Sequence, residues 1–206
     1  MFRIASRIQA LSAICLATFA SLLAASLAHA ETVAPPACPA VELDTPFAKW
    51  NDFAKYFLVP GGDFESADKG WRLEGGAALA GEDESFGVRS LEGTSSLILP
   101  PGSTATSPEI CVGLEYPTLR FFARAYAPSA ARLSVHVLFR TPDNTPRQLR
   151  IADLTAGQAW EPTRIIFILA NFLALHPNWD GKVAFRFTAT SGTVGVDDVF
   201  VDPYER

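Results

Sequence analysis

The segment RLSVHVLFR, residues 132–140, decides the fold because apolar and polar side chains alternate along it with a period of two. One face carries Leu133, Val135, Val137 and Phe139, and the other carries Arg132, Ser134, His136 and Arg140. Leu138 alone breaks the alternation. This pattern predicts a half-buried antiparallel β-strand. Residues 183–188 repeat it, because their bulky apolar side chains also fall on every second position.

Most of the remaining sequence also favours short strands separated by turns. Further strands are expected at residues 71–73, 95–99, 119–126, 160–169 and 194–201. Clusters of Gly, Pro, Asn and Asp lie between them, as at Pro142-Asp143-Asn144. Two segments, residues 47–56 and 170–175, are compatible with a short helix or a helical turn. Many short strands without a long helix predict an all-β fold, an antiparallel jelly-roll β-sandwich.

The first 30 residues have the layout of a secretory signal peptide. Arg3 and Arg7 precede an apolar run, and the segment ends on Ala28-His29-Ala30, an A-x-A cleavage pattern. The alternative is an uncleaved membrane anchor, because the apolar run is almost long enough to span a bilayer. Cleavage is the preferred interpretation and predicts a secreted protein, extracellular or periplasmic. Residues 31–45 then form an N-terminal arm, and residues 46–206 form a single β-sandwich domain.

The charge of the chain gives no reason to expect nucleic acid or an anionic membrane as a partner. The full sequence has a formal net charge of −5, and loss of the two arginines in residues 1–30, which contain no acid, leaves −7. An acidic chain without a basic run lacks the electrostatic attraction that binds polyanions. No segment after residue 30 is apolar for long enough to span a membrane.

Two cysteines, Cys38 and Cys111, remain after removal of the signal peptide. In an oxidising compartment two cysteines most often pair, so we expect a structural disulfide between the N-terminal arm and a strand near mid-chain.

Two short motifs near the ends of the β-rich region suggest a family. They are GDFESADKGW at residues 62–71 and VGVDDV at residues 194–199. This pairing resembles the galactose-binding-like jelly-roll modules, which include many carbohydrate-binding modules of secreted glycoside hydrolases, and small secreted bacterial proteins with the same opening and closing motifs. The resemblance implies that the two motifs lie side by side.

The resemblance also implies a structural calcium ion, for which Glu65, Asp197 and Asp198 are the candidate ligands. Calcium prefers carboxylate and carbonyl oxygens. The family pattern favours Asp197, whereas strand parity would place Asp198 on the inner face unless a bulge intervenes. Alternatively, these carboxylates only accept backbone hydrogen bonds or cap turns.

Two sets of residues are candidates for a ligand-binding surface. Trp179 lies in a turn-rich loop and is the tryptophan best placed to expose a ring on which a sugar could stack, although covering the end of the sandwich is an equal alternative. The second set would form a cationic face if its strands are neighbours: Arg120, Arg124, Tyr126, His136 and Arg186. Guanidinium groups there could hold carboxylated or sulfated glycans, and the alternative is an ordinary solvated face with cross-strand ion pairs.

The sequence is poor in catalytic signatures, because it contains no G-x-S-x-G, H-E-x-x-H or phosphate-binding Gly-rich pattern. Together with this, the resemblance to the galactose-binding-like modules implies a non-catalytic module that binds carbohydrate or another cell-envelope polymer. The first alternative is a structural or adhesive envelope protein that binds other proteins, which an exposed apolar patch would favour. A small glycan-active enzyme is the second alternative and would require two carboxylates that face each other across a cleft.

Overall fold

The computed structural model describes residues 38–65, 70–89, 93–126 and 128–204. The predicted signal peptide and the first part of the N-terminal arm lie outside these ranges. Two 3₁₀ helices and thirteen strands are formed within them, in this order along the chain: η1 (Ala48–Trp50), β1 (Phe57–Leu58), β2 (Arg72–Glu74), β3 (Ala78–Ala80), β4 (Ser96–Leu99), β5 (Thr104–Thr106), β6 (Ile110–Cys111), β7 (Thr118–Ala125), β8 (Ala131–Arg140), β9 (Pro146–Ala156), β10 (Glu161–Pro162), β11 (Ile166–Phe167), η2 (Ala170–Leu175), β12 (Lys182–Ser191) and β13 (Val194–Asp202).

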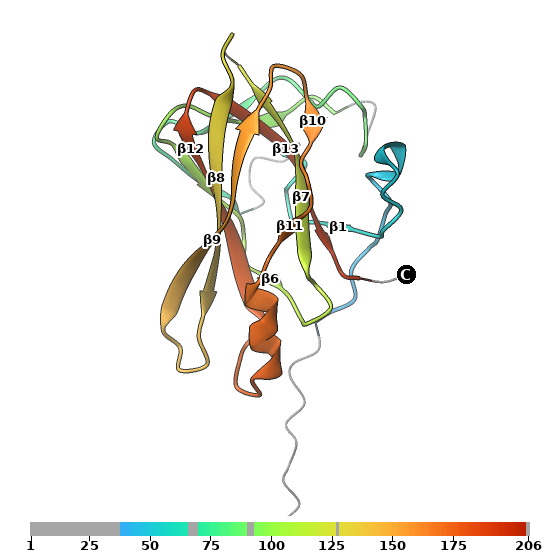
Figure 1. Ribbon diagram of the computed structural model, residues 1–206, viewed down its shortest axis with the longest axis vertical. Coiled ribbons are helices and arrows are strands. Elements are labelled where there is room, and N and C mark those ends of the chain that lie inside the picture. The colour runs from blue at the N-terminus through green and yellow to red at the C-terminus, as the bar shows by residue number, and fades with distance from the viewer. Residues whose placement is uncertain (1–37, 66–69, 90–92, 127, 205–206) are drawn as a thin grey trace, which may run out of the picture. The chain divides into compact units, whose positions relative to one another are not determined.

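The strands form two sheets in which the pairings are antiparallel (Figure 1). The seven-stranded sheet has the order β10-β7-β13-β4-β3, with β1 also pairing with β13 and β11 with β7. The six-stranded sheet has the order β2-β5-β12-β8-β9, with β6 also pairing with β12. The predicted all-β class and the two-layer antiparallel sandwich are confirmed.

Alternation in β8 and β12 works as the sequence pattern predicts. The two strands are neighbours, with Val137 opposite Phe185 and Val135 opposite Phe187, and these four side chains are buried in the core. Strand β9, which the pattern did not predict, pairs with β8 along its length. A turn around Asn144, whose φ of 65° lies in the left-handed region that Asn tolerates, joins β8 to β9.

Apolar side chains from both sheets meet in the main core. Phe121 of β7 and Phe187 of β12 belong to different sheets, and their rings are 5.1 Å apart in an edge-to-face arrangement. Both side chains are fully buried. Because each inner face supplies every second residue of its strands, packing the two faces together removes most of the large apolar side chains from water.

A second aromatic cluster lies on the outer face of the seven-stranded sheet. It consists of Phe47, Tyr56, Phe122, Trp160 and Phe200. The Phe47 ring stacks on Phe122 at 5.5 Å, so the segment that contains η1 covers this face (Figure 1). In the same view no helix lies over β8 and β9 on the side away from β7 and β13. The two outer faces therefore differ, because the segment containing η1 covers one and no helix of the described residues covers the other.

Other predictions have mixed outcomes. The disulfide between Cys38 and Cys111 is present, with a Cα–Cα distance of 5.4 Å. The helical turn at residues 170–175 is confirmed as η2, and η1 lies within the segment 47–56. The single strand expected at 160–169 is wrong, because this segment forms two short strands, β10 and β11, which both pair with β7, and residues 163–165 lie outside them. Within the described ranges no helix is long and apolar enough to cross a membrane.

Candidate functional site

The two motifs near the ends of the β region meet in space. Strand β1 pairs with β13, with Phe57 opposite Val201. Beyond β1, the Val59 amide donates to the Val199 carbonyl at 2.9 Å, and the Val199 amide donates to the Gly62 carbonyl at 3.0 Å. A Cβ at Gly62 would lie 3.0 Å from that Val199 carbonyl oxygen, so a residue without a side chain is needed here.

A β-bulge in β13 creates the acidic part of this region. Strand β4 pairs with β13 as far as Val196, and β1 pairs with it from Phe200 onward. On the other edge, the register with β7 shifts between Asp197 and Phe200. Asp198 is the left-handed residue of this stretch, with a φ of 48°. The bulge therefore ends the simple inward–outward alternation at the point where the two aspartates occur.

Asp197 is completely buried and acts as a hydrogen-bond acceptor for the backbone. Its Oδ1 accepts from its neighbour's amide, that of Asp198, at 2.8 Å, and its Oδ2 accepts from the Glu84 amide at 3.0 Å. Burial, the charge of Asp198 and a side-chain hydrogen bond with Asp83 raise the pKa of Asp197 to about 10. The alternative interpretation of this residue, an acceptor of backbone hydrogen bonds, describes its observed contacts.

Asp198 is buried, with 3% of its surface exposed. It lines a small pocket of about 100 Å³ together with Asp63, Glu65, Asp83, Arg89 and Gly93. Burial and the charges of nearby carboxylates, Glu84 first, raise the pKa of Asp198 to about 8, and Arg89 opposes the increase. Asp63 and Asp83 were not predicted as calcium ligands, and they come from the β1–β2 and β3–β4 connections.

The carboxylate oxygens that line this pocket are the kind of ligand that a hard cation such as calcium prefers, although they are not arranged as a metal site among the described residues. Glu65 already accepts hydrogen bonds from the Thr94 and Ser95 amides, each at 2.8 Å. Among the described residues, no three Asp, Glu, His or Cys side chains form a ready-made metal-binding group. A cation would therefore have to draw the side chains of Asp63, Asp83 and Asp198 closer together.

Trp179 does not expose its ring. The side chain is 2% exposed, and its Nε1 donates to the Arg140 carbonyl at 2.9 Å. It packs against the main core, so the alternative interpretation, a loop tryptophan that covers the end of the sandwich, describes its position.

Three of the five residues expected on a cationic face lie on the seven-stranded sheet and not on the six-stranded sheet, which contains His136 and Arg186. Arg120, Arg124 and Tyr126 come from β7 or directly follow it, in the seven-stranded sheet. The Arg120 guanidinium lies 4.1 Å from the centre of the Phe47 ring and 2.6 Å from Asp52, so the segment containing η1 buries it. Arg124 pairs with Glu82. The prediction that these residues share one face with His136 and Arg186 is therefore wrong.

His136 and Arg186 are direct cross-strand neighbours on the six-stranded sheet. They belong to a row that crosses five strands in register, from β2 to β9. We call this set the arginine row: Arg72, Thr106, Arg186, His136 and Arg150. Burial, followed by the charges of Arg150 and Arg186, lowers the pKa of His136, which favours the neutral imidazole.

A pocket of about 450 Å³ adjoins the arginine row on the same sheet. The shared residues Arg72 and Thr106 connect the two. Leu138 and Ala184 contribute apolar surface, and the charged side chains around them are Arg72, Glu109, Arg140, Arg147, Asp180 and Lys182. This face therefore combines hydrogen-bonding groups, apolar surface and a hollow.

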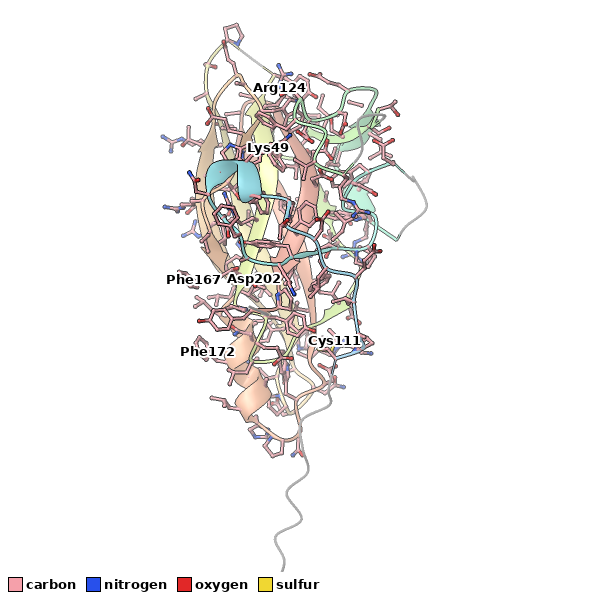
Figure 2. The ribbon with its side chains drawn as sticks, turned by 90° about the vertical axis from the view of Figure 1, so that its right-hand side faces the viewer. Lys49, Cys111, Arg124, Phe167, Phe172 and Asp202 are labelled. Atoms are coloured by element: carbon pink, nitrogen blue, oxygen red, sulfur yellow. A yellow bond between two sulfur atoms is a disulfide. The ribbon has the colours of Figure 1, made fainter. Side chains whose placement is uncertain are left out.

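An exposed apolar segment occupies residues 165–175, in and around β11 and η2. Five large apolar side chains in it are exposed: Ile165, Phe167, Leu169, Phe172 and Leu175. Phe167 is 62% exposed and Phe172 is 59% exposed, and both lie toward the same end of the domain (Figure 2). Such a concentration of exposed apolar side chains is unusual on a monomer surface.

No protein-family model matches the chain, and no curated protein matches it by sequence. Solved structures do match. The CBM22-1 xylan-binding domain of Xyn10C from Paenibacillus barcinonensis is 13% identical, with a TM-score of 0.49 over 80% of this chain and 97% of that domain. The family 11 carbohydrate-binding module from Clostridium thermocellum, in complex with a mixed-linked tetrasaccharide, is 12% identical, with a TM-score of 0.44 over 68% of this chain and 92% of that module.

The CBM22-1–CBM22-2 tandem domain of the same Xyn10C is 13% identical and gives a TM-score of 0.50 over 81% of this chain. The match covers 47% of the tandem domain, so this chain spans about half its length. Identity at this level bears on the fold alone. The chain has a β-sandwich fold of the kind found in carbohydrate-binding modules.

Proposed function

We propose that the chain is a secreted, non-catalytic module that binds carbohydrate or another cell-envelope polymer through the outer face of its six-stranded sheet. One observation carries the proposal. The outer face of the other sheet is covered by the segment containing η1, whereas no helix of the described residues covers this face, which holds a pocket of about 450 Å³. The sandwich fold shared with the tandem carbohydrate-binding domain supports it, and the disulfide and the predicted signal peptide support export.

Binding of polysaccharide tests this proposal directly. The purified protein is applied to insoluble polysaccharides and to a glycan array, and retention is compared with that of an Arg72→Ala/Arg186→Ala variant. We expect retention on at least one glycan and its loss in the variant. Arg164→Ala is a matched control, because Arg164 is exposed but follows β10 at the other sheet. If the double variant is retained as strongly as the wild type, the binding site does not lie on this face.

The exposed apolar segment at residues 165–175 favours a second candidate function, an adhesive or structural protein that binds other proteins. Large exposed apolar surfaces mark such interfaces. Phe167→Ser and Phe172→Ser reduce this surface without touching the six-stranded sheet. If the second function is correct, these two variants should lose the association between protein molecules that sedimentation measures, while their retention on glycans is unchanged.

We also propose that the pocket lined by Asp198 holds a structural calcium ion. The support is the buried carboxylate of Asp198 in a pocket that is also lined by Asp63, Glu65 and Asp83. A cation that binds only the folded state at a hundred times its Kd would stabilise the protein by about 2.7 kcal/mol.

Thermal unfolding after treatment with a chelator tests the calcium proposal. Calcium titrated into this protein should raise the Tm, and magnesium at the same concentration should have less effect, because it requires a more rigid octahedral site. An unchanged Tm at millimolar calcium rules out a stabilising ion.

A further inference from the structure

The arginine row places three guanidinium groups and an imidazole across one sheet. Arg72 lies opposite Thr106, Thr106 opposite Arg186, Arg186 opposite His136, and His136 opposite Arg150. Neighbouring strands are about 4.8 Å apart, so the five strands span about 19 Å. Each of the two outer arginines is two strands, or about 10 Å, from the central Arg186. The row is thus long enough to contact several units of an extended polymer.

The central arginine has no acidic partner. The Arg186 Nη1 donates to Gln148 Oε1 at 3.2 Å and its Nε donates to Thr106 Oγ1 at 3.4 Å. No carboxylate of the described residues lies within ion-pair distance of it. These neutral partners hold the guanidinium in place and leave its charge uncompensated.

The outer arginines have only weak ion pairs. Arg72 lies 3.6 Å from Glu74, and Arg150 lies 3.5 Å from Asp153. All four side chains are more than half exposed, so solvent screens these pairs and a ligand anion can compete for the arginines. Arg140, Arg147 and Lys182 around the adjoining pocket have no ion-pair partner among the described residues.

The charge of this face is opposite to that of the chain. The arginine row, the adjoining pocket and the ion-pair partners of the outer arginines together contain six cationic side chains, Arg72, Arg140, Arg147, Arg150, Lys182 and Arg186, and four carboxylates, Glu74, Glu109, Asp153 and Asp180. The whole sequence has 17 Lys and Arg residues against 22 Asp and Glu. Segregation of this kind attracts anions to one surface of an acidic protein.

The face has few of the rings that suit neutral sugars, and Phe139 of β8, which is half-buried, is the aromatic side chain that lines its pocket. The exposed aromatic side chains of the described ranges are Phe53, Phe167, Phe172 and Tyr204, and none belongs to a strand of the six-stranded sheet. Apolar sugar faces are bound mainly by stacking on such rings. With only a half-buried ring at the pocket, charge-assisted hydrogen bonds from guanidinium forks are the strongest contacts that this sheet can offer a glycan.

We infer that the arginine row binds an anionic polysaccharide through the carboxylate or sulfate groups of its sugars, an inference that rests on the proposed glycan-binding function. Arg186 makes the central contact, with Arg72 and Arg150 on either side. Loss of one charge-assisted contact of this kind lowers affinity by about ten- to hundredfold.

Affinity electrophoresis of the purified protein tests the inference. The probes are polygalacturonate for carboxylates, dextran sulfate for sulfates, and unsubstituted xylan and mixed-linked glucan as neutral glycans. Arg186→Gln removes the central charge and keeps hydrogen-bonding capacity, and Arg150→Gln changes an exposed arginine whose loss leaves the core intact. Arg164→Gln removes one charge elsewhere. Thermal unfolding verifies that each variant is folded.

The expected result is retardation by at least one anionic probe, weakened about tenfold or more by Arg186→Gln and by Arg150→Gln but not by Arg164→Gln. Added salt should weaken it as well, because screening reduces attraction between exposed charges. The probe that binds identifies carboxylate or sulfate as the ligand group. Binding of neutral glycans alone overturns this inference and leaves the proposed function standing, whereas absence of binding to every glycan overturns both. Equal losses in all three variants would indicate non-specific attraction and also overturn the inference.

Discussion

Replacing Asp198 by asparagine should stabilise the calcium-free protein at neutral pH. The pKa of Asp198 is raised to about 8, mainly because the side chain is 3% exposed and Glu84, Asp83 and Asp63 are nearby. Since this pKa lies above the unfolded value, the stability that the protonated group contributes is complete below about pH 4 and is lost as the pH rises toward 8. Asparagine is neutral at every pH and also tolerates the φ of 48° at this position.

The size of the effect follows from proton linkage. One pKa unit corresponds to about 1.4 kcal/mol, so Asp198 alone removes about 4 kcal/mol of unfolding free energy between pH 4 and pH 7. The variant and the wild type should have similar Tm values at the lower pH. At the higher pH the Tm of Asp198→Asn should exceed that of the wild type by roughly 10 °C, because 1 kcal/mol corresponds to about 2–4 °C for a domain of this size.

The assay is thermal unfolding in chelator from about pH 4 to about pH 8. Asp197→Asn is measured beside it, because Asp197 is the other buried carboxylate with a raised pKa and its replacement also removes a proton-linked loss of stability. Both Asp197 oxygens accept backbone amides, so an amide nitrogen there meets a donor and should cost about 1–3 kcal/mol. In the presence of calcium the wild type should have the higher Tm and Asp198→Asn the lower one, because the ion would stabilise only the chain that retains Asp198. Parallel Tm curves for wild type and Asp198→Asn across this pH range would refute the reasoning.

Three further predictions concern residues that hold the sandwich together. Asp52→Ala should cost about 3–5 kcal/mol in chemical denaturation, because it leaves the buried Arg120 guanidinium unpaired, and an Asp52→Ala/Arg120→Met variant should recover part of that loss. Replacing Cys38 and Cys111 by serine opens a loop of 73 residues and should cost about 4 kcal/mol, whereas an unchanged midpoint would show that the bridge adds no stability. Trp179→Phe should cost about 1 kcal/mol in denaturation and leave glycan retention unchanged, since the ring is buried and its Nε1 is satisfied by the Arg140 carbonyl.

Alternation in the sequence predicted the parts of the fold where one face is buried and the other is exposed. Strands β8 and β12 have this pattern and occupy the centre of their sheet. Strand β9 was not predicted, because it is an edge strand that begins with a proline and exposes its first five residues, including Leu149. An edge strand has one free side and needs little apolar alternation, so periodicity carries almost no signal there.

The candidate sites were predicted less completely, for two physical reasons. Parity assigns a side chain to a face of its own strand but does not say which sheet that strand joins, and this is why Arg124 and Arg186 were expected together. Parity also fails at a bulge, and the shift after Asp197 is not encoded by any alternation nearby. The meeting of the two end motifs was predicted only from the family resemblance, because antiparallel pairing between residues 57 and 201 leaves no local pattern in the sequence.

The position of the two candidate sites explains how stability and binding can be separated in this domain. Asp198 lies in the seven-stranded sheet, beside the segments that fold over its outer face, whereas the arginine row lies on the six-stranded sheet, and the main core packs between the two sheets. A cation at Asp198 would therefore act on the contact between residues 59–65 and β13 and not on the face that we propose binds glycan. Because a packed core holds each sheet in a fixed shape, neutralising Asp198 should change the Tm without altering glycan retention, and neutralising Arg150 should do the reverse.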